Sequence, residues 1–285
     1  MKATKAVALG AASVAMSIGI AIPGLTGAGA AKPRPGALAA SVKTAVRPGA
    51  PARILQERTR VTVRAAGAGA HLAETASTSS NWSGYAVGGE SYTYVVGKWK
   101  VPTATCASGE NSQSSTWVGL DGWGDQTVEQ VGSTTGCIFG IPSYFAWTEM
   151  YPALPVPSSD TISPGDSVGA YVKSTDHGTD YQLVMSDYTK GWKFSTTETS
   201  SPADQDLSAE WITEQPTCPI FCDNLTDFGS TTFHDAYATG NGHRGPVSSF
   251  TDNYAVDMTS GSTVKAAVTP LSTAGTSFTD RWYHS

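Results

Sequence analysis

Basic residues are scarce over most of this chain of 285 residues. From Ser79 onward there are eight Lys or Arg against 22 Asp or Glu, so the formal net charge of this part is 8 − 22 = −14. Proteins bind the phosphate backbone of nucleic acids mainly through Lys and Arg. The composition therefore argues against a nucleic-acid partner.

Motifs for metal chemistry are missing as well. None of the four histidines after Ser79 lies in H-E-x-x-H or another short ligand spacing. Cys218 and Cys222 have no second close Cys or His pair, which argues against a structural zinc site. We therefore expect no metal and no other cofactor. The histidines are His177, His234, His243 and His284.

The sequence contains a motif of a catalytic serine, but the residues around it do not fit the structure that the motif needs. Residues 165–169 match G-x-S-x-G, but that motif needs a strand, a sharp turn and a helix. Here Ala170-Tyr171-Val172 follows, which is typical of a strand, so Ser167 is interpreted as part of a turn that enters a strand. No free cysteine nucleophile remains if all cysteines pair. Carboxylates and amides are left for catalysis.

The first 30 residues predict a secretory signal peptide. A short basic start, Met1 to Lys5, is followed by a mostly apolar run to Leu25 and by small residues at Ala28-Gly29-Ala30. Gly10, Pro23 and Gly24 interrupt the run, which favours removal over membrane spanning. We expect a secreted, extracellular protein without a membrane anchor once the signal is removed.

Residues 31–78 differ from both neighbouring parts. They hold eight Lys or Arg and two acidic residues, so their net charge is 8 − 2 = +6, and they contain no Cys or Trp. Such a segment cannot bury a core of its own. A basic leader before an acidic domain at 79–285 predicts a weakly structured propeptide that inhibits the domain. A disordered linker is the alternative.

An even number of cysteines in a secreted chain suggests disulfides. The sequence does not fix the pairing. Cys218 with Cys222 would close a small loop, and Cys106 with Cys137 a larger one. Asn81-Trp82-Ser83 and Asn224-Leu225-Thr226 fit glycosylation acceptors.

The acidic domain shows little helical periodicity. Short alternating runs rich in Val, Tyr, Trp and Thr are separated by Gly, Pro, Asp and Ser, which predicts an all-β sandwich or barrel. We expect strands in, among others, residues 92–101, 115–120, 144–150, 167–172, 181–187, 209–214 and 231–238.

Several of these strands combine aromatic residues with carboxylates on one face. Side chains alternate between the faces of a strand, so each of three sets shares a face, and such a mixture suits a groove that holds an extended chain. The sets are Trp117, Gly119 and Asp121; Phe145, Trp147, Glu149 and Tyr151; and Glu210, Ile212 and Glu214.

Seven segments, taken together, resemble the glutamic peptidases, or eqolisins (peptidase family G1). Each is weak alone, but their order and spacing are specific, and they cover most of the chain after Ser79. The segments are Asn81-Trp82-Ser83-Gly84-Tyr85, Trp99-Lys100-Val101-Pro102, residues 117–122 (WVGLDG), Glu129-Gln130-Val131-Gly132, residues 146–152 (AWTEMYP), residues 209–214 (AEWITE) and Asp227-Phe228-Gly229-Ser230.

This resemblance implies a concanavalin-like antiparallel β-sandwich of two large sheets, with a substrate groove on a bent sheet. It also implies a catalytic pair, which falls on Gln130 and Glu214. Trp82, Trp117 and Trp147 fall on walls of the site, and Asp121, Glu149 and Tyr151 on supporting or substrate-binding positions. Glu210, on the same strand face as Glu214, is the alternative catalytic acid.

The implied chemistry is peptide-bond hydrolysis in acid. One carboxylate can activate water as a base and then protonate the leaving amine as an acid, and a glutamate near its reference pKa of about 4.3 is suited to this. An amide keeps its role at any pH, since its NH2 donates to the oxyanion. We expect a secreted, monomeric endopeptidase that cleaves polypeptides and is inhibited by its own propeptide.

Two other functions fit part of the pattern. A β-sandwich glycoside hydrolase would use Glu149 and Glu214 as its carboxylate pair. A carbohydrate-binding module would stack the aromatic residues on sugars. The Q-x-G segment and the acidic domain behind a basic leader argue against both.

Overall fold

The computed structural model describes residues 74–285 apart from 177, 201–204 and 218–223. The signal peptide, nearly all of the leader, His177, Cys218 and Cys222 lie outside the described residues. Within the part described, no helix has the length and apolar character needed to cross a membrane.

The described residues form an all-β structure, as the sequence predicted. Apart from one 3-10 turn, η1 (Val247–Ser249), every regular element described is a strand. The strands are β1 (Thr75–Ser79), β2 (Trp82–Gly88), β3 (Tyr92–Lys100), β4 (Ser112–Leu120), β5 (Val128–Ile138), β6 (Ile141–Tyr151), β7 (Val156–Pro157), β8 (Ser167–Ser174), β9 (Asp180–Asp187), β10 (Trp192–Thr199), β11 (Ala209–Glu214), β12 (Asn224–Leu225), β13 (Ser230–Gly240), β14 (His243–Pro246), β15 (Asp252–Ser260), β16 (Thr263–Val268) and β17 (Phe278–Trp282).

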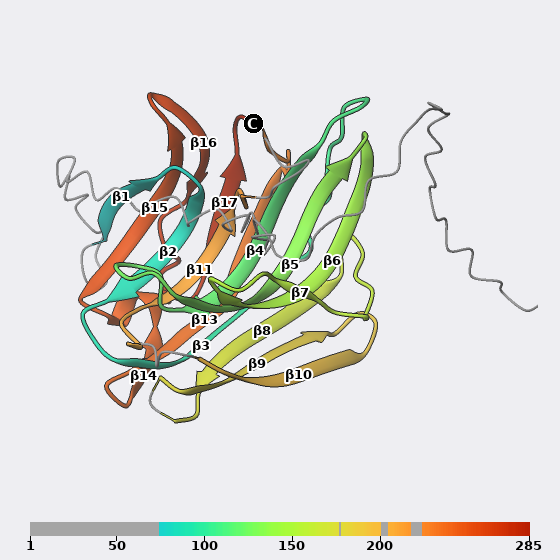
Figure 1. Ribbon diagram of the computed structural model, residues 1–285. Helices are drawn as coiled ribbons and strands as arrows, with labels where there is room; N and C mark the ends of the chain where they lie inside the picture. The colour runs from blue at the N-terminus through green and yellow to red at the C-terminus, as the bar shows by residue number, and fades with distance from the viewer. Residues whose placement is uncertain (1–73, 177, 201–204, 218–223) are drawn as a thin grey trace, which may run out of the picture. The chain divides into compact units, whose positions relative to one another are not determined.

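The strands make two mostly antiparallel sheets (Figure 1). Sheet A runs β7-β6-β5-β4-β11-β2-β15, with β1 parallel to β15, and continues from β15 through β16 and β17. Sheet B runs β10-β9-β8-β3-β13-β14. The predicted two-sheet architecture is confirmed.

Strand β13 belongs to both sheets. Its first residues, Ser230–Phe233, pair with β17 of sheet A, and from His234 onward it pairs with β3 of sheet B. The register shifts between His234 and Tyr237, and Asp235 in that interval has a positive φ of 52°. An irregularity of this kind bends a strand, which lets one strand pass from one sheet to the other.

The main core lies between the sheets. Val118, Val131 and Trp211 of sheet A pack with Val95 and Trp99 of sheet B in one apolar cluster, and all five are buried. The indole Nε1 of Trp211 donates a hydrogen bond of 2.7 Å to the carbonyl of Val96, so even this large side chain leaves no polar atom unsatisfied.

A second apolar cluster covers the opposite, outer face of sheet A. It contains four tryptophans and four aliphatic side chains from β2, β4, β5, β6, β11, β15 and the β4–β5 loop, and it includes Trp82, Trp117, Trp123, Trp147 and Ile212. Sheet A is therefore apolar on both faces. Ten of the 11 residues of β5 are buried for this reason.

A disulfide joins Cys106 to Cys137, with a Cα–Cα distance of 5.7 Å and a sequence separation of 31. This confirms one of the two bridges suggested by the sequence. A loop of this size is stabilised by about 3–4 kcal/mol in the chain-entropy account. The bridge fixes the segment before β4 to the end of β5.

The start of the described chain is part of sheet A. In β1, Thr75 lies opposite Tyr254 and Ser79 opposite Met258. Just before it, the Glu74 carboxylate accepts hydrogen bonds from the Tyr85 hydroxyl, at 3.0 Å, and the Leu271 backbone N–H, at 3.2 Å. Residues 75–78, placed in the leader on composition, thus pair within the sheet.

Candidate active site

Gln130, Glu149 and Glu214 meet at one cavity of ≈ 210 Å³ on the outer face of sheet A. Gln130 comes from β5, Glu149 from the adjacent β6 and Glu214 from β11, two strands away on the other side of β5. The remaining lining residues are Trp82, Gln113, Ser115, Val128, Thr134, Phe145, Trp147, Tyr151, Leu154, Pro155, Pro216 and Thr217.

The glycine of the Q-x-G segment has a steric cause. Gly132 lies opposite Trp117 on β4, and a Cβ added at Gly132 would lie 2.5 Å from the Trp117 Cβ and 2.5 Å from the Thr116 carbonyl oxygen. Only glycine leaves room for Trp117 across this strand. The indole of Trp117 can then reach Glu214 beside Gln130.

Two donors hold the Glu214 carboxylate. Trp117 Nε1 donates to Oε2 at 2.9 Å, and Asn81 Nδ2 donates to Oε1 at 3.2 Å. Asn81 precedes β2, which pairs with β11 so closely that a Cβ at Gly84 would lie 2.1 Å from the Trp211 carbonyl oxygen. The glycine of the N-W-x-G segment thus brings the asparagine to the glutamate.

The Gln130 amide is tied to Glu149. The two residues lie directly opposite one another on β5 and β6, and Gln130 Nε2 donates to Glu149 Oε2 at 2.8 Å. The other end of the amide, Oε1, is buried and has no hydrogen-bond partner among the described residues. One polar atom of the amide is therefore unpaired within the described part of the chain.

Both carboxyl groups of the cavity favour the protonated form. Burial raises the pKa of Glu214 to about 7, although the hydrogen bonds from Trp117 and Asn81 oppose this. Burial and the nearby Glu214 raise the pKa of Glu149 to about 8. The expectation that Glu214 titrates near its reference value is wrong, because the sequence does not reveal how fully the apolar face of sheet A covers the carboxyl group.

The predicted wall residues divide into two groups. Trp82, Trp147 and Tyr151 line the cavity, and Trp147 is oriented by a hydrogen bond of 3.0 Å from its Nε1 to Thr134 Oγ1. Trp117 lies beneath them, fully buried and edge-on to Trp82 at a ring distance of 5.0 Å. Trp117 therefore supports Glu214 and does not form a wall.

Asp121 lies apart from the cavity. It is fully buried, and its carboxylate accepts backbone hydrogen bonds from Asp206 at 3.0 Å and Leu207 at 2.5 Å. Burial and the nearby Asp125 raise its pKa to about 8. This geometry ties the β4–β5 loop to the segment before β11, and it offers no contact to a substrate in the cavity.

Glu210, the alternative catalytic acid, is also fully buried and does not line the cavity. Its pKa lies well above the ordinary range because of burial and the nearby Asp121 and Asp125. The face shared by Glu210, Ile212 and Glu214 is as predicted, but only its Glu214 end opens to the cavity.

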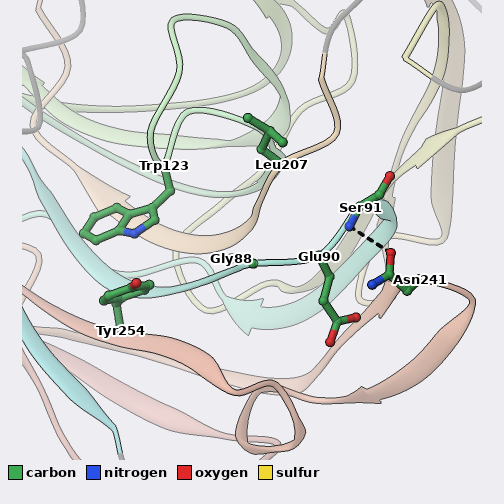
Figure 2. Close-up of a pocket in the computed structure, with 8 residues that line it drawn as sticks. Gly88, Glu90, Ser91, Trp123, Leu207, Asn241 and Tyr254 are labelled. Atoms are coloured by element: carbon green, nitrogen blue, oxygen red, sulfur yellow. Dashed lines mark hydrogen bonds between the residues drawn. The ribbon is translucent and has the colours of Figure 1, made fainter.

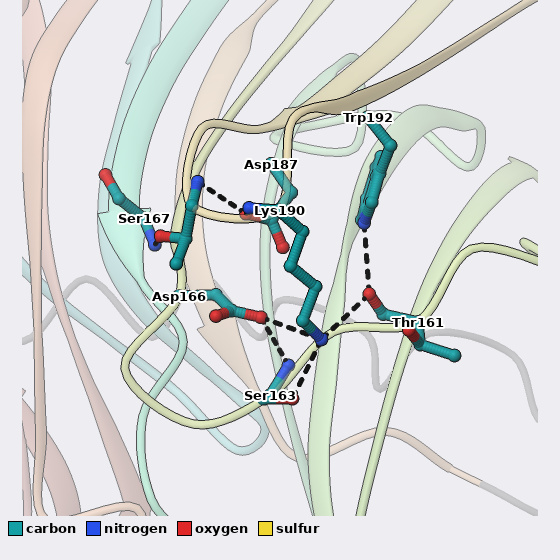
Figure 3. Close-up of polar contacts among 8 residues, drawn as sticks. Thr161, Ser163, Asp166, Ser167, Asp187, Lys190 and Trp192 are labelled. Atoms are coloured by element: carbon teal, nitrogen blue, oxygen red, sulfur yellow. Dashed lines mark hydrogen bonds and ion pairs between the residues drawn. The ribbon is translucent and has the colours of Figure 1, made fainter.

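Ser167 lies at the start of β8, as a turn entering a strand requires. Figure 3 shows its surroundings: Lys190 Nζ donates to Ser163 Oγ at 2.8 Å and pairs with Asp166 at 3.1 Å. These contacts join two loops. No histidine takes part in them, and no cluster of three or more His, Cys, Asp or Glu suited to a metal occurs among the described residues.

A larger cavity, ≈ 520 Å³, lies at the far end of β2 (Figure 2). Trp123 and Tyr254, with ring centroids 5.1 Å apart, form one side, and Glu90, Ser91 and Asn241 the other. It contains one carboxylate and no neighbouring acid or amide pair comparable with Gln130 and Glu214. The smaller cavity is therefore the candidate active site.

Sequence reasoning missed three contributors to the site. Asn81 was noted as a glycosylation acceptor and as the first residue of the N-W-x-G segment but was given no role in the site, and it is 7% exposed and bonded to Glu214. Thr134 and Ser115, linked by a 2.9 Å hydrogen bond between their hydroxyl oxygens, form the cavity floor. The one available signal was the position of Thr134 four residues after Gln130, on the same strand face.

Comparison with known proteins identifies the class to which this fold and site belong. The model of the Peptidase A4 family matches residues 80–279. The chain therefore belongs to this family, the eqolisins or glutamic peptidases, as the resemblance in its segments predicted.

The individual relatives agree. The chain is 34% identical over 190 residues to Aspergillopepsin-2 of Aspergillus niger, a match that covers 58% of this chain and 66% of that protein. Scytalidoglutamic peptidase, solved with a peptide-based transition-state analogue, superposes with a TM-score of 0.61 at 25% identity, covering 72% of this chain and 98% of that one. Aspergilloglutamic peptidase from Aspergillus niger gives 0.52 at 30% identity, covering 60% and 99%.

Proposed function

We propose that this chain is a secreted endopeptidase that works in acid, with Glu214 as general base and acid and Gln130 as oxyanion donor. The observation that carries the proposal is the meeting of these two side chains, from β5 and β11, at one cavity. Membership of the glutamic peptidase family supports the reaction class.

The reaction needs no group beyond these two and water. Ionised Glu214 takes a proton from the water molecule while the water oxygen bonds to the carbonyl carbon of the scissile peptide. The carbonyl oxygen becomes negative and accepts a hydrogen bond from the Gln130 NH2. As the C–N bond breaks, Glu214 returns the proton to the leaving amine.

The raised pKa of Glu214 constrains how kcat and kcat/KM of the proposed reaction depend on pH. At pH 3–4 the carboxyl group is mostly protonated in the free enzyme, since its pKa is about 7. Hydrogen bonds from bound water and substrate N–H groups favour the ionised form. We therefore expect the acid limb of kcat, which reports the substrate complex, to lie at lower pH than that of kcat/KM, which reports free enzyme.

The aromatic residues suit a polypeptide substrate. Trp82, Trp147 and Tyr151 line the cavity together with Phe145 and Leu154. Apolar walls with a few polar groups bury and orient a ligand, so these side chains would hold the residues on either side of the scissile bond. Glu149, which accepts a hydrogen bond from Gln130, lines the same cavity.

The basic leader completes the proposal. At neutral pH a segment of charge +6 precedes a domain of charge −14. Opposite charges attract, and the attraction weakens as Asp and Glu become protonated near pH 4. Release of the leader in acid would activate the enzyme. Because β1 pairs with β15, and Glu74 is bonded to Tyr85 and Leu271, we place the cleavage before Glu74.

Two experiments test these points. The purified protein is incubated with a denatured protein and with a soluble glucan in ¹⁸O-water at acid pH. Cleaved polypeptide with one ¹⁸O in each new carboxyl group supports the proposal. Cleaved glucan together with an uncleaved polypeptide substrate would refute it.

In the second experiment, the precursor is held at pH 7 and at pH 3.5, and its mass and activity are followed. Full activity of uncleaved precursor at pH 7 would rule out inhibition by the leader.

A further inference from the structure

Gln130 can face its neighbours in two ways. An amide has an acceptor end and a donor end of the same shape, and rotation of the terminal torsion by about 180° exchanges them. In the orientation observed, NH2 donates to Glu149 at 2.8 Å, and the buried Oε1 is the end without a partner. In the reverse orientation, Oε1 faces Glu149 and NH2 takes the open position.

The protonation state of Glu149 decides between the two orientations. An ionised carboxylate is an acceptor only, so it holds the NH2 of Gln130 and leaves an acceptor in the open position. A protonated carboxyl group has an O–H donor, so it can bond Oε1 and leave the NH2 free. Only the second arrangement offers both NH2 hydrogens to a developing oxyanion.

We propose that Glu149 is a positioning residue whose carboxylic proton turns the Gln130 amide, so that its NH2 faces the oxyanion position. This inference rests on the proposed function, since it assigns a role to Glu149 within the same reaction. It makes peptide hydrolysis depend on a proton that is never transferred to the substrate.

Among the described residues that line the cavity, the one charged neighbour of Glu149 favours that proton. Glu214 faces it from β11, and Tyr151 lies two residues away on β6. Opposite it on β5 is the uncharged Gln130. No Lys, Arg or His lines the cavity among the described residues. Two carboxylates in a cavity without a cation repel one another, so Glu149 holds a proton while Glu214 is ionised and acts as base.

Substitution of Glu149 tests the proposal through the alkaline limb of the pH–rate profile. Glu149→Gln has an NH2 donor at every pH, so we expect its alkaline limb to move up by at least about one pH unit, with kcat at the optimum within about tenfold of the original. Glu149→Leu has no donor, and we expect a loss of roughly 100- to 1000-fold, as for loss of an oxyanion donor. Glu210→Gln, a buried carboxyl outside the cavity, is the matched control and should leave the limb in place.

A spectroscopic measurement follows the proton itself. In protein carrying ¹³C at the glutamate carboxyl carbons, the signal that Glu149→Gln removes should titrate at the pH of the alkaline limb. Circular dichroism at each pH shows that the limb reflects activity and not unfolding. An unchanged limb in Glu149→Gln, or a Glu149 signal that titrates below that of Glu214, would overturn the proposal. Full activity of Glu214→Gln would instead overturn the proposed catalytic pair.

Discussion

Glu210 and Glu214 lie on the same face of β11, four residues apart, and both have raised pKa values. They differ in access and in partners. Glu214 borders the cavity and is held by Trp117 and Asn81. Glu210 is fully buried near Asp121 and Asp125. A raised pKa therefore does not by itself distinguish the proposed catalytic acid from a structural one. Access to a cavity and donors that orient the carboxylate distinguish Glu214 from Glu210.

The sharpest test of this comparison is the pair of amide variants. We expect Glu214→Gln to lower kcat by at least about 1000-fold, because it removes the group that the proposed mechanism uses as both base and acid. Glu210→Gln should stay within a few-fold of the original enzyme. Cleavage of a fluorogenic peptide measures both, and circular dichroism checks the fold. The opposite ranking would make Glu210 the catalytic acid.

The second test addresses the amide of the pair. Gln130→Ala should lower kcat by roughly 100- to 1000-fold, as measured for other oxyanion donors, with a smaller change in KM. Gln113, which lines the same cavity from β4, is the matched amide. If Gln113→Ala costs as much as Gln130→Ala, the special role of Gln130 is refuted.

The third test compares buried with exposed carboxyl groups through stability. Burial raises the pKa of Asp280 to about 7 and that of Asp121 to about 8. Between the unfolded value near 4 and these values the folded state binds more protons, so stability is full below about pH 4 and falls as pH rises through 7–8. Urea unfolding of the purified protein should therefore give a lower free energy at pH 8 than at pH 4.

Variants separate the contributions of single carboxyl groups to this pH dependence of stability. Asp280→Asn should weaken this fall by roughly 1–3 kcal/mol. Asp235, whose pKa is lowered by Lys98, is an exposed carboxyl that behaves in the opposite sense. The small stabilisation that Asp235 provides is present above its unfolded pKa and is lost as the pH drops below it. Asp235→Asn should therefore leave the decrease in the free energy of unfolding above pH 4 unchanged. A stability that rises from pH 4 to pH 8 would contradict the assignment of buried, protonated carboxyls.

The smallest expected effect concerns the donor to Glu214. Trp117→Phe keeps an aromatic ring at this position, although a smaller one, and removes the N–H that donates to the carboxylate. The pKa of Glu214 should then rise, and the acid limb of kcat/KM should move up by about one pH unit. Trp147→Phe, which changes another ring of the cavity and whose N–H donates to Thr134, is the control. Equal shifts in both variants would show that packing, and not the hydrogen bond, sets the pKa.

The strands that the sequence predicted are those whose runs are rich in Val, Tyr, Trp and Thr. β11 begins and ends at the predicted residues, 209 and 214, and β3, β4, β6, β8, β9 and β13 include the other predicted runs to within one residue. β5 was not among them. Its sequence is rich in Gly, Thr and Ser, and with sheet A covered on both faces it shows no alternation of apolar and polar residues.

The site was predictable only as far as sequence segments reach. Gln130, Glu149, Glu214, Trp82, Trp147 and Tyr151 line one cavity, so the segments brought the right residues together. Asp121 belongs to the W-V-G-x-D-G segment, yet its carboxylate caps backbone N–H groups at positions 206 and 207. Asn81 contacts Glu214 across 133 residues, through strand pairing that no local pattern encodes.

The passage of β13 from one sheet to the other has a mechanical consequence. Because the same strand is hydrogen-bonded to β17 on one side of the bend and to β3 on the other, one layer cannot slide over the other without breaking these bonds. The two layers are therefore tied together at this bend, and any rearrangement that shifts one sheet over the other is opposed by the hydrogen bonds of this one strand.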